Sequence, residues 1–240
     1  MKKIAAILFA AVVLFACSKE KSAEDILNEV EKEHDKLKAL EIEAKDKQAQ
    51  VINRYDYQNH KFLLVSKGEP EIVRYLEGET FYAADQGEIV NLEKVISRVF
   101  KEWAKYTMDC DRNLLSCFKR SYDDFYKDFI VKEDGDNYVL IYQGGEEEKR
   151  KILQKVIDDG ESGVEKAGEK PREIKVGKVS TLTLEAIVDK ESHRLIKVKQ
   201  VVKYESESKD ENETIDGEMT YNYVAYDEEV EKIEKPEIFE

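Results

Sequence analysis

The segment Asp109–Asn113, "DCDRN", places oxygen-bearing side chains at the alternating positions with which a calcium-binding loop begins. Such a loop needs glycine at its sixth position for a sharp turn, and Leu114 stands there. Its twelfth position should supply a bidentate glutamate, and Arg120 stands there. The calcium interpretation therefore fails, and the sequence predicts no metal site and no cofactor.

The second group with reactive side chains is a pair of cysteines, Cys110 and Cys117, with six residues between them. In an oxidising compartment they could form a disulfide, and closing so short a loop would stabilise the fold by about 2–3 kcal/mol. In a reducing habitat both would remain free thiols. The sequence leaves these two states open.

The histidines and paired acids do not form a catalytic pattern. His34, His60 and His193 are scattered, and none belongs to a Cys/His cluster at zinc spacing. His34 falls within an apolar helical stripe, which favours a packed side chain over a ligand. The acid pairs Asp123-Asp124 and Asp134/Asp136 are typical of solvated surfaces. With no Gly-rich phosphate loop, G-x-S-x-G or H-E-x-x-H motif, we expect that the protein is not an enzyme.

The N-terminal residues have the pattern of an export signal. After two lysines comes an apolar run of 12 residues, Ile4–Phe15, which is too short to span a bilayer as a helix. Leu14, Ala16 and Cys17 then resemble the lipobox of bacterial lipoproteins, although Phe15 is larger than the residue usual at that position. The alternative is an ordinary secreted protein with an incidental cysteine.

The lipobox resemblance implies cleavage between Ala16 and Cys17, which removes residues 1–16 as a signal peptide. The Cys17 sulfur would carry a diacylglyceryl group, with acyl chains such as palmitate, as an anchor in the cell membrane. Two acyl chains hold far more firmly than one, since each buried CH₂ contributes about 0.8 kcal/mol. Residues 17–22 would be a tether, and residues 23–240 a single domain on the extracytoplasmic face.

Composition excludes one class of partner. The net charge is −14, and loss of the two signal-peptide lysines makes the mature chain −16. Such a chain is repelled by nucleic acid, so we expect no nucleic-acid binding. Aromatic residues make up 10% of the chain and the apolar residues are periodic, which predicts a packed core despite 38% charged residues.

The first half of the chain predicts a helix, short strands and a second helix. Ser22 and Asp25 are typical of a helix start, and the helix is expected to run to about Leu40. Residues 41–90 have the pattern of short strands, and the helical period returns in "NLEKVISRVFKEWAKY". The clearest hairpin joins Ile72–Leu76 to Thr80–Ala84 through Glu77-Gly78.

The middle of the chain predicts aromatic packing and a third helix. In "CFKRSYDDFYKDF", five aromatic residues fall on one helical face: Phe118, Tyr122, Phe125, Tyr126 and Phe129. "NYVLIY" predicts a strand, and Glu146–Asp158 a helix that Gly160 terminates. Residues 159–170 are then expected to form a loop.

The last third predicts long strands that alternate between apolar and polar residues, with one covered and one solvated face. The charged stretch Glu205–Glu218 is expected to connect two of them. The residues predicted to face the core are Leu182, Leu184, Ala186 and Val188 in one strand, Ile196, Val198, Val202 and Tyr204 in the next, and Met219, Tyr221, Tyr223 and Ala225 in the last.

The order of these elements resembles the LolA/LolB/LppX-like bacterial lipoproteins, and above all their small Gram-positive relatives of unassigned function. The segments that carry the resemblance are "SAEDILNEVEKEHDKLKALEIEA", "RYLEGETFYAAD" and "TYNYVAYDEEVEKIEKPE". The resemblance implies an α+β fold in which a curved antiparallel sheet, an incomplete barrel, is covered on its apolar concave face by helices. It also implies binding of acyl chains or of envelope proteins.

Two functions follow as hypotheses. The first is a lipid-anchored protein that holds a lipid or acyl chain between sheet and helices, for which the candidate residues are Phe100, Trp103, Phe118, Tyr122, Phe125, Leu184, Val198 and Tyr221. The second is a protein-binding adaptor without a small ligand, as in germination-type lipoproteins. An inert structural module is a further alternative.

Overall fold

The computed structural model describes residues 21–240 except 69–70, 93 and 209–211. In these residues one antiparallel sheet of eleven strands forms the frame, in the order β6-β5-β4-β3-β2-β1-β11-β10-β9-β8-β7. Neighbouring strands are consecutive in the sequence except β1 and β11, which pair Leu40 with Tyr226. The strands are β1 (Ala39–Lys45), β2 (Gln50–Asp56), β3 (Lys61–Ser66), β4 (Ile72–Glu77), β5 (Thr80–Asp85), β6 (Glu88–Ile89), β7 (Phe129–Asp134), β8 (Asn137–Tyr142), β9 (Lys175–Asp189), β10 (Leu195–Glu207) and β11 (Asn212–Tyr226).

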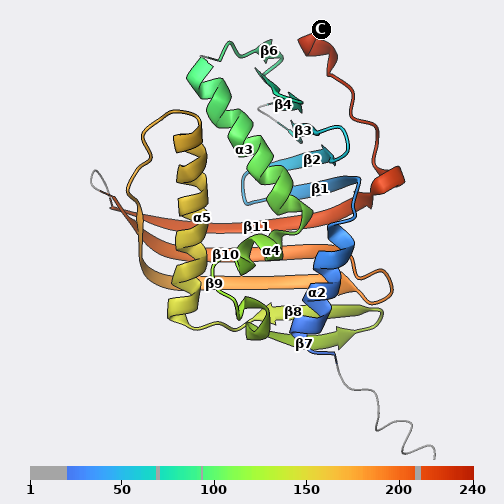
Figure 1. Ribbon diagram of the computed structural model, residues 1–240, viewed down its shortest axis with the longest axis vertical. Coiled ribbons are helices and arrows are strands. Elements are labelled where there is room, and N and C mark those ends of the chain that lie inside the picture. The colour runs from blue at the N-terminus through green and yellow to red at the C-terminus, as the bar shows by residue number, and fades with distance from the viewer. Residues whose placement is uncertain (1–20, 69–70, 93, 209–211) are drawn as a thin grey trace, which may run out of the picture.

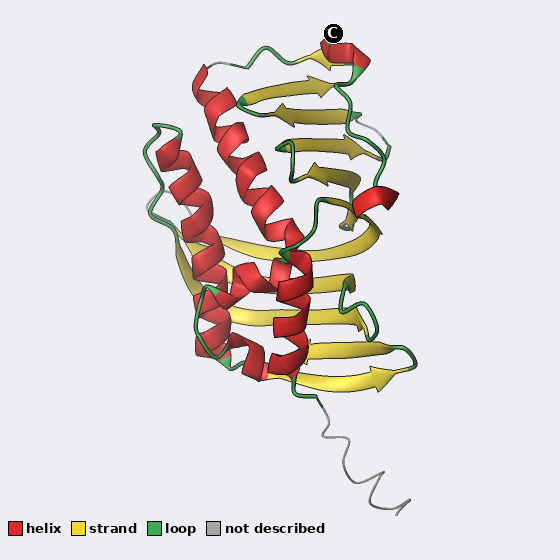
Figure 2. Cartoon of the chain, turned by 45° about the vertical axis from the view of Figure 1, so that its right-hand side comes forward, coloured by secondary structure: helices red, strands yellow, loops and turns green. Residues whose placement is uncertain are grey.

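The helices gather on one face of this sheet, which we call the inner face (Figure 1). They are α2 (Ala23–His34), α3 (Lys94–Arg112), α4 (Leu114–Lys119), the short 3₁₀ helix η1 (Phe125–Asp128) and α5 (Glu146–Lys166). The sheet stays open and bends around the helices (Figure 2). This confirms the predicted class, an α+β fold with helices covering one face of an open antiparallel sheet.

The outer face is covered in part by the C-terminal tail, which contains η2 (Asp227–Glu229) and η3 (Glu237–Phe239). Because side chains alternate along a strand, Phe62 packs in the inner core whereas Leu63 faces outward. Ile233 and Phe239 of the tail bury that outward surface. The sheet region β3–β5 therefore has apolar contacts on both faces.

Local signals in the sequence are confirmed where they concern caps, turns and alternation. The Ser22 hydroxyl accepts a hydrogen bond from Asp25 N–H at 3.1 Å, completing a capping box. The predicted hairpin is β4–β5, with Gly78 at a φ of +58° in the turn. The β9 side chains at 182, 184, 186 and 188 are all buried.

The first helix was predicted too long, because α2 ends at His34 rather than near Leu40. Leu40 is buried as part of β1, where its backbone pairs with Tyr55 and Tyr226 on its two sides. A central strand satisfies its backbone hydrogen bonds as fully as a helix does and here also buries Leu40 and Ile42 in the inner core, so tertiary packing overrides the local helical period.

The aromatic run is also not one helical face. Phe118 lies in α4, Phe125 and Tyr126 lie in η1, and Phe129 begins β7. The residues still meet, since the Phe125 ring lies 6.3 Å from Phe118 and 5.2 Å from Phe129, each pair edge to face. The prediction of a shared core was therefore correct and the prediction of its secondary structure was wrong.

The expected stop at Gly160 is wrong, because α5 continues to Lys166. The helix ends instead at Gly168, whose φ of +92° allows a Schellman motif in which Glu169 N–H donates to Val164 O at 3.1 Å. A glycine inside a helix costs only about 1 kcal/mol relative to alanine, which packing against the sheet and α3 can outweigh. Most of the expected loop at 159–170 is therefore helical.

Two features of the long strands differ from expectation. Ile196 is 39% exposed and Leu195 is buried instead, because the β9–β10 register shifts between Leu195 and Lys197. The charged stretch Glu205–Glu218 is mostly strand: β10 and β11 pair from Lys197–Asn222 out to Glu207–Asn212. The polar composition of this stretch fits the exposed side chains at the paired ends of β10 and β11.

Candidate functional site

An apolar cleft lies between α3 and α5, and we call it the helix cleft. Its volume is about 260 Å³. It holds two of the predicted ligand residues: Trp103 is 39% exposed, and Phe100 is partly buried beside it. Each packs on the sheet behind it, Phe100 stacking on Phe81 with ring centroids 5.6 Å apart and Trp103 meeting Phe62 edge to face at 5.9 Å. The cleft is lined by Val99, Phe100, Glu102, Trp103, Tyr106, Asp159, Gly160, Gly163 and Val164.

The α5 wall of the helix cleft is formed by glycines. A Cβ atom added at Gly160 or at Gly163 would meet no atom within 4 Å. Two helix-interior glycines cost about 2 kcal/mol relative to alanine. This cost is not required for close packing of the helices, because the space beside each glycine is open. The two glycines therefore leave open space beside Trp103.

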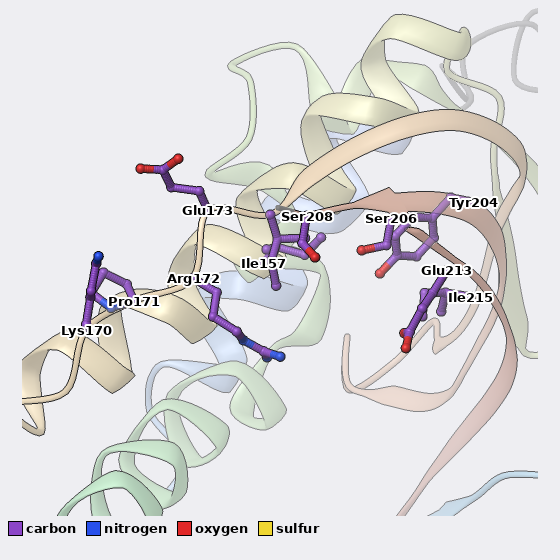
Figure 3. Close-up of a pocket in the computed structure, with 11 residues that line it drawn as sticks. Ile157, Lys170, Pro171, Arg172, Glu173, Tyr204, Ser206, Ser208, Glu213 and Ile215 are labelled. Carbon is purple, nitrogen blue, oxygen red and sulfur yellow. The ribbon is translucent and has the colours of Figure 1, made fainter. Parts of the chain in front are cut away.

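A second cleft, of about 500 Å³, opens between β10–β11 and the segment 170–174 that follows α5 (Figure 3). We call it the sheet cleft. Its apolar lining comes from Ile157 of α5 and from Tyr204 and Ile215, which are cross-strand partners. Its polar lining includes Arg172, Glu213 and Ser206. The two clefts reach α5 at Ile157 and Gly160, less than one helical turn apart.

The segment 170–174 is held beside α5 by side chains of that helix. Gln154 donates to Ile174 O at 2.9 Å and accepts from Val176 N–H at 2.9 Å, so its amide substitutes for a neighbouring strand. Glu161 accepts the Arg172 backbone N–H at 2.6 Å. These contacts fix one wall of the sheet cleft.

The predicted residue Tyr221 lines a third cleft, of about 440 Å³, further along the same strands. Val202 and Met219 line it with Tyr221, and Gly217, which pairs with Val202, contributes no side chain. The inner face of β10–β11 is thus hollowed at two neighbouring places, where Val202, Tyr204 and Tyr221 are only partly buried against the core.

The remaining predicted residues belong to the packed core. Phe118, Phe125, Leu184 and Val198 are each at most 4% exposed. Tyr122 is partly buried, and its hydroxyl donates to Asp128 at 2.6 Å and lies 2.6 Å from the Tyr142 hydroxyl. The structure therefore separates the predicted set: Phe100, Trp103 and Tyr221 line clefts, whereas the others hold the core together.

A buried polar cluster that the sequence did not indicate lies at the end of α3. The Asp111 carboxylate accepts hydrogen bonds from the Tyr55 hydroxyl and from Asn53 Nδ2, the latter at 3.3 Å. Burial raises the pKa of Asp111 to about 6, and the two hydrogen bonds partly oppose that rise. No local sequence signal reports this cluster, since its members come from β2 and α3 and meet only in the folded chain.

Cys110 and Cys117 are joined by a disulfide that links α3 to α4. Across the part of the chain that the structure describes, His, Cys, Asp and Glu side chains form no group of three or more able to hold a metal ion. Within the same part no helix has the length and apolar character that a membrane crossing needs. Ala16 and Cys17, and with them the cleavage and lipidation sites, lie outside the described residues.

The fold and the clefts define an α+β protein in which helices cover one face of an open antiparallel sheet and leave apolar hollows at their margin. The chain belongs to a family of unknown function, DUF6612, which matches residues 57–238. No curated protein matches this chain. The solved structure of the Mycobacterium tuberculosis lipoprotein LppX is similar, with 8% sequence identity, coverage of 86% of this chain and 95% of that chain, and a TM-score of 0.42. At this level of likeness no function is transferred from LppX.

Proposed function

We propose that this protein is a membrane-anchored extracytoplasmic lipoprotein that binds an apolar ligand, a lipid or an acyl chain, at the margin between helices and sheet. The observation that carries the proposal is the helix cleft, in which an exposed tryptophan faces two glycines across open space. Covering apolar surface contributes about 25 cal/mol per Å², so burial of a chain against Trp103 and Phe100 would drive binding. The proposed role is binding without catalysis.

The volume of the cleft limits what can enter. Pockets for drug-sized ligands typically measure about 300–1,000 Å³, and the helix cleft at about 260 Å³ is slightly smaller. It is suited to one segment of an acyl chain. The rest of the ligand would lie outside it, and the nearby sheet cleft of about 500 Å³ is where that part would be held.

Tryptophan fluorescence can report binding at the helix cleft, because Trp103 is the one tryptophan of the chain. Protein purified under native conditions is extracted for bound lipid, and the delipidated protein is titrated with alkyl ligands while tryptophan emission is followed. We expect copurified lipid, and a blue shift as Trp103 is covered. Gly163→Leu should abolish the shift by filling the cleft.

Gly163→Ala is the matched control at the same position, because one methyl group leaves most of the space open. A chain with no copurified lipid, and with the same tryptophan emission in the presence and absence of alkyl ligands, would refute lipid binding. A single stoichiometric protein partner captured by cross-linking in cells, together with that negative result, would favour the adaptor hypothesis instead.

A further inference from the structure

The sheet cleft carries opposite charges on opposite sides. Arg172 comes from the segment after α5, and Glu213 comes from β11. In Figure 3 these two side chains extend toward each other across the cleft, whereas the side chains of Lys170 and Glu173, which also line it, are not directed toward Glu213. The apolar residues Ile157, Tyr204 and Ile215 line the space between them. The cleft thus combines a cationic side, an anionic side and an apolar lining.

The Arg172 guanidinium is available to a ligand. The side chain is 76% exposed, and within the described residues it forms one ion pair, a 3.4 Å contact from its terminal nitrogen Nη2 to Glu161 Oε1. The position of Arg172 does not depend on that contact, because its backbone N–H donates to Glu161 Oε2 at 2.6 Å. A guanidinium on a fixed backbone, with donors left over, is suited to bidentate binding of phosphate.

The charges also restrict the kind of head group. A purely anionic group at Arg172 would be repelled by Glu213 and by the net charge of −14. A purely cationic group would be repelled by Arg172. A group with both charges satisfies both sides of the cleft, and the apolar lining accepts the start of its alkyl chain.

Resting on the proposed function, we infer that the ligand is a zwitterionic amphiphile of the phospholipid type, with its phosphate at Arg172 and its ammonium at Glu213. Its chain would lie along Ile157 and enter the helix cleft beside Gly160, which is less than one helical turn further along α5. The sheet cleft would thus select the head group, and the helix cleft would bury the alkyl chain.

The test compares four single-chain probes with the same decyl tail, each below its micelle concentration: decylphosphocholine, decyl phosphate, decyltrimethylammonium and decyl maltoside. Affinity is measured by calorimetry, and tail insertion by Trp103 emission. We expect decylphosphocholine to bind best, by about fivefold, since exposed ion pairs contribute only modestly. The preference should shrink at high salt.

Two variants test whether Arg172 binds the phosphate and Glu213 binds the ammonium. Arg172→Gln should weaken decylphosphocholine and decyl phosphate, and Glu213→Gln should weaken decylphosphocholine and decyltrimethylammonium, each by about fivefold and without changing decyl maltoside. Lys203→Gln and Glu205→Gln are matched controls on β10, the strand paired with β11, at positions whose side chains face away from the cleft, and they should change nothing.

Equal binding of all four probes, indifferent to both variants, would overturn the head-group assignment while leaving apolar binding intact. Tighter binding of decyl phosphate or decyltrimethylammonium than of decylphosphocholine would overturn it too. Failure of all four probes to bind would overturn the proposed function as well.

Discussion

His34 Nε2 accepts a hydrogen bond from Leu195 N–H at 3.0 Å, across 161 residues of sequence. Its other ring nitrogen, Nδ1, donates to the Arg112 carbonyl, which requires the neutral ring with its proton on Nδ1. One fully buried imidazole therefore links α2, the end of α3 and the start of β10. Protonation would turn Nε2 into a donor facing another donor and break that link.

Lowering the pH should remove a stabilising contribution of His34. Burial lowers its pKa from 6.5 to about 4, so the unfolded chain binds the proton more readily than the folded one. The resulting stability is fully present above pH 6.5 and is lost as the pH falls toward 4, by about 3 kcal/mol. Urea unfolding at several pH values measures it. In His34→Gln this contribution is absent, so the difference between the variant and the wild type isolates it.

The contribution of Asp111 to stability should depend on pH with the opposite sign, over nearly the same pH range. Burial raises its pKa from 3.8 to about 6, so its contribution is present below pH 3.8 and is lost as the pH rises through 6, by about 3 kcal/mol. In the wild type the two effects largely cancel between pH 4 and 6. Asp111→Asn should therefore show the full His34 slope, and an unchanged profile in this variant would contradict the assignment.

Replacing the cleft glycines by alanine should stabilise the protein. Gly160→Ala and Gly163→Ala each add a Cβ atom in open space and improve helix propensity, so each should raise the free energy of unfolding by about 0.5–1 kcal/mol. Gly144→Ala provides contrast, because its Cβ atom would collide with the Tyr142 hydroxyl and should destabilise by about 1–3 kcal/mol. Denaturant titration measures all three, and destabilisation by the first two would mean that the space is not open.

Core and cleft aromatics should respond differently to truncation. Phe125 is fully buried among other rings, so Phe125→Ala should cost about 3–5 kcal/mol of stability. Phe100→Ala should cost less and should weaken binding of alkyl ligands, because Phe100 is partly buried and lines the helix cleft. Ile130→Ala, at a side chain that is 45% exposed, should change stability by no more than about 0.5 kcal/mol. Ligand binding that survives Phe100→Ala unchanged would argue against the cleft.

Reduction should weaken the junction of α3 and α4. The disulfide between Cys110 and Cys117 closes a short loop, so breaking it should cost about 2–3 kcal/mol. The double variant Cys110→Ala/Cys117→Ala should start with that lower stability and be insensitive to reductant. Thermal unfolding with and without reductant makes the comparison, and a reductant-insensitive wild type would mean that the thiols are free.

Cys17→Ser should release the protein from the membrane. The variant loses the thiol that would carry the acyl chains, and fractionation of cells should then find it outside the membrane fraction. Cys110→Ser should remain membrane-bound. A wild-type protein that is exported yet unmodified at residue 17 would contradict both the anchor and the proposed location.

The sequence determined those parts of the fold in which neighbours along the chain decide the outcome. The Ser22–Asp25 cap and the Gly78 turn depend on contacts within four residues, and the alternation in β9 depends on which side chains can be buried together. The aromatic content of the helix cleft was visible in the same way, because Phe100 and Trp103 are three residues apart on one helix.

Only the tertiary structure decided where distant segments meet. It ended α2 early by pairing Leu40 with two strands, carried α5 through Gly160, and separated the core rings of Phe118 and Phe125 from the cleft residues. It also brought His34 to Leu195 and Asp111 to Tyr55. The physical reason is that the spacing of apolar residues shows which face of a helix or strand is buried. Which other element covers that face depends on competition among all segments for backbone pairing and close packing.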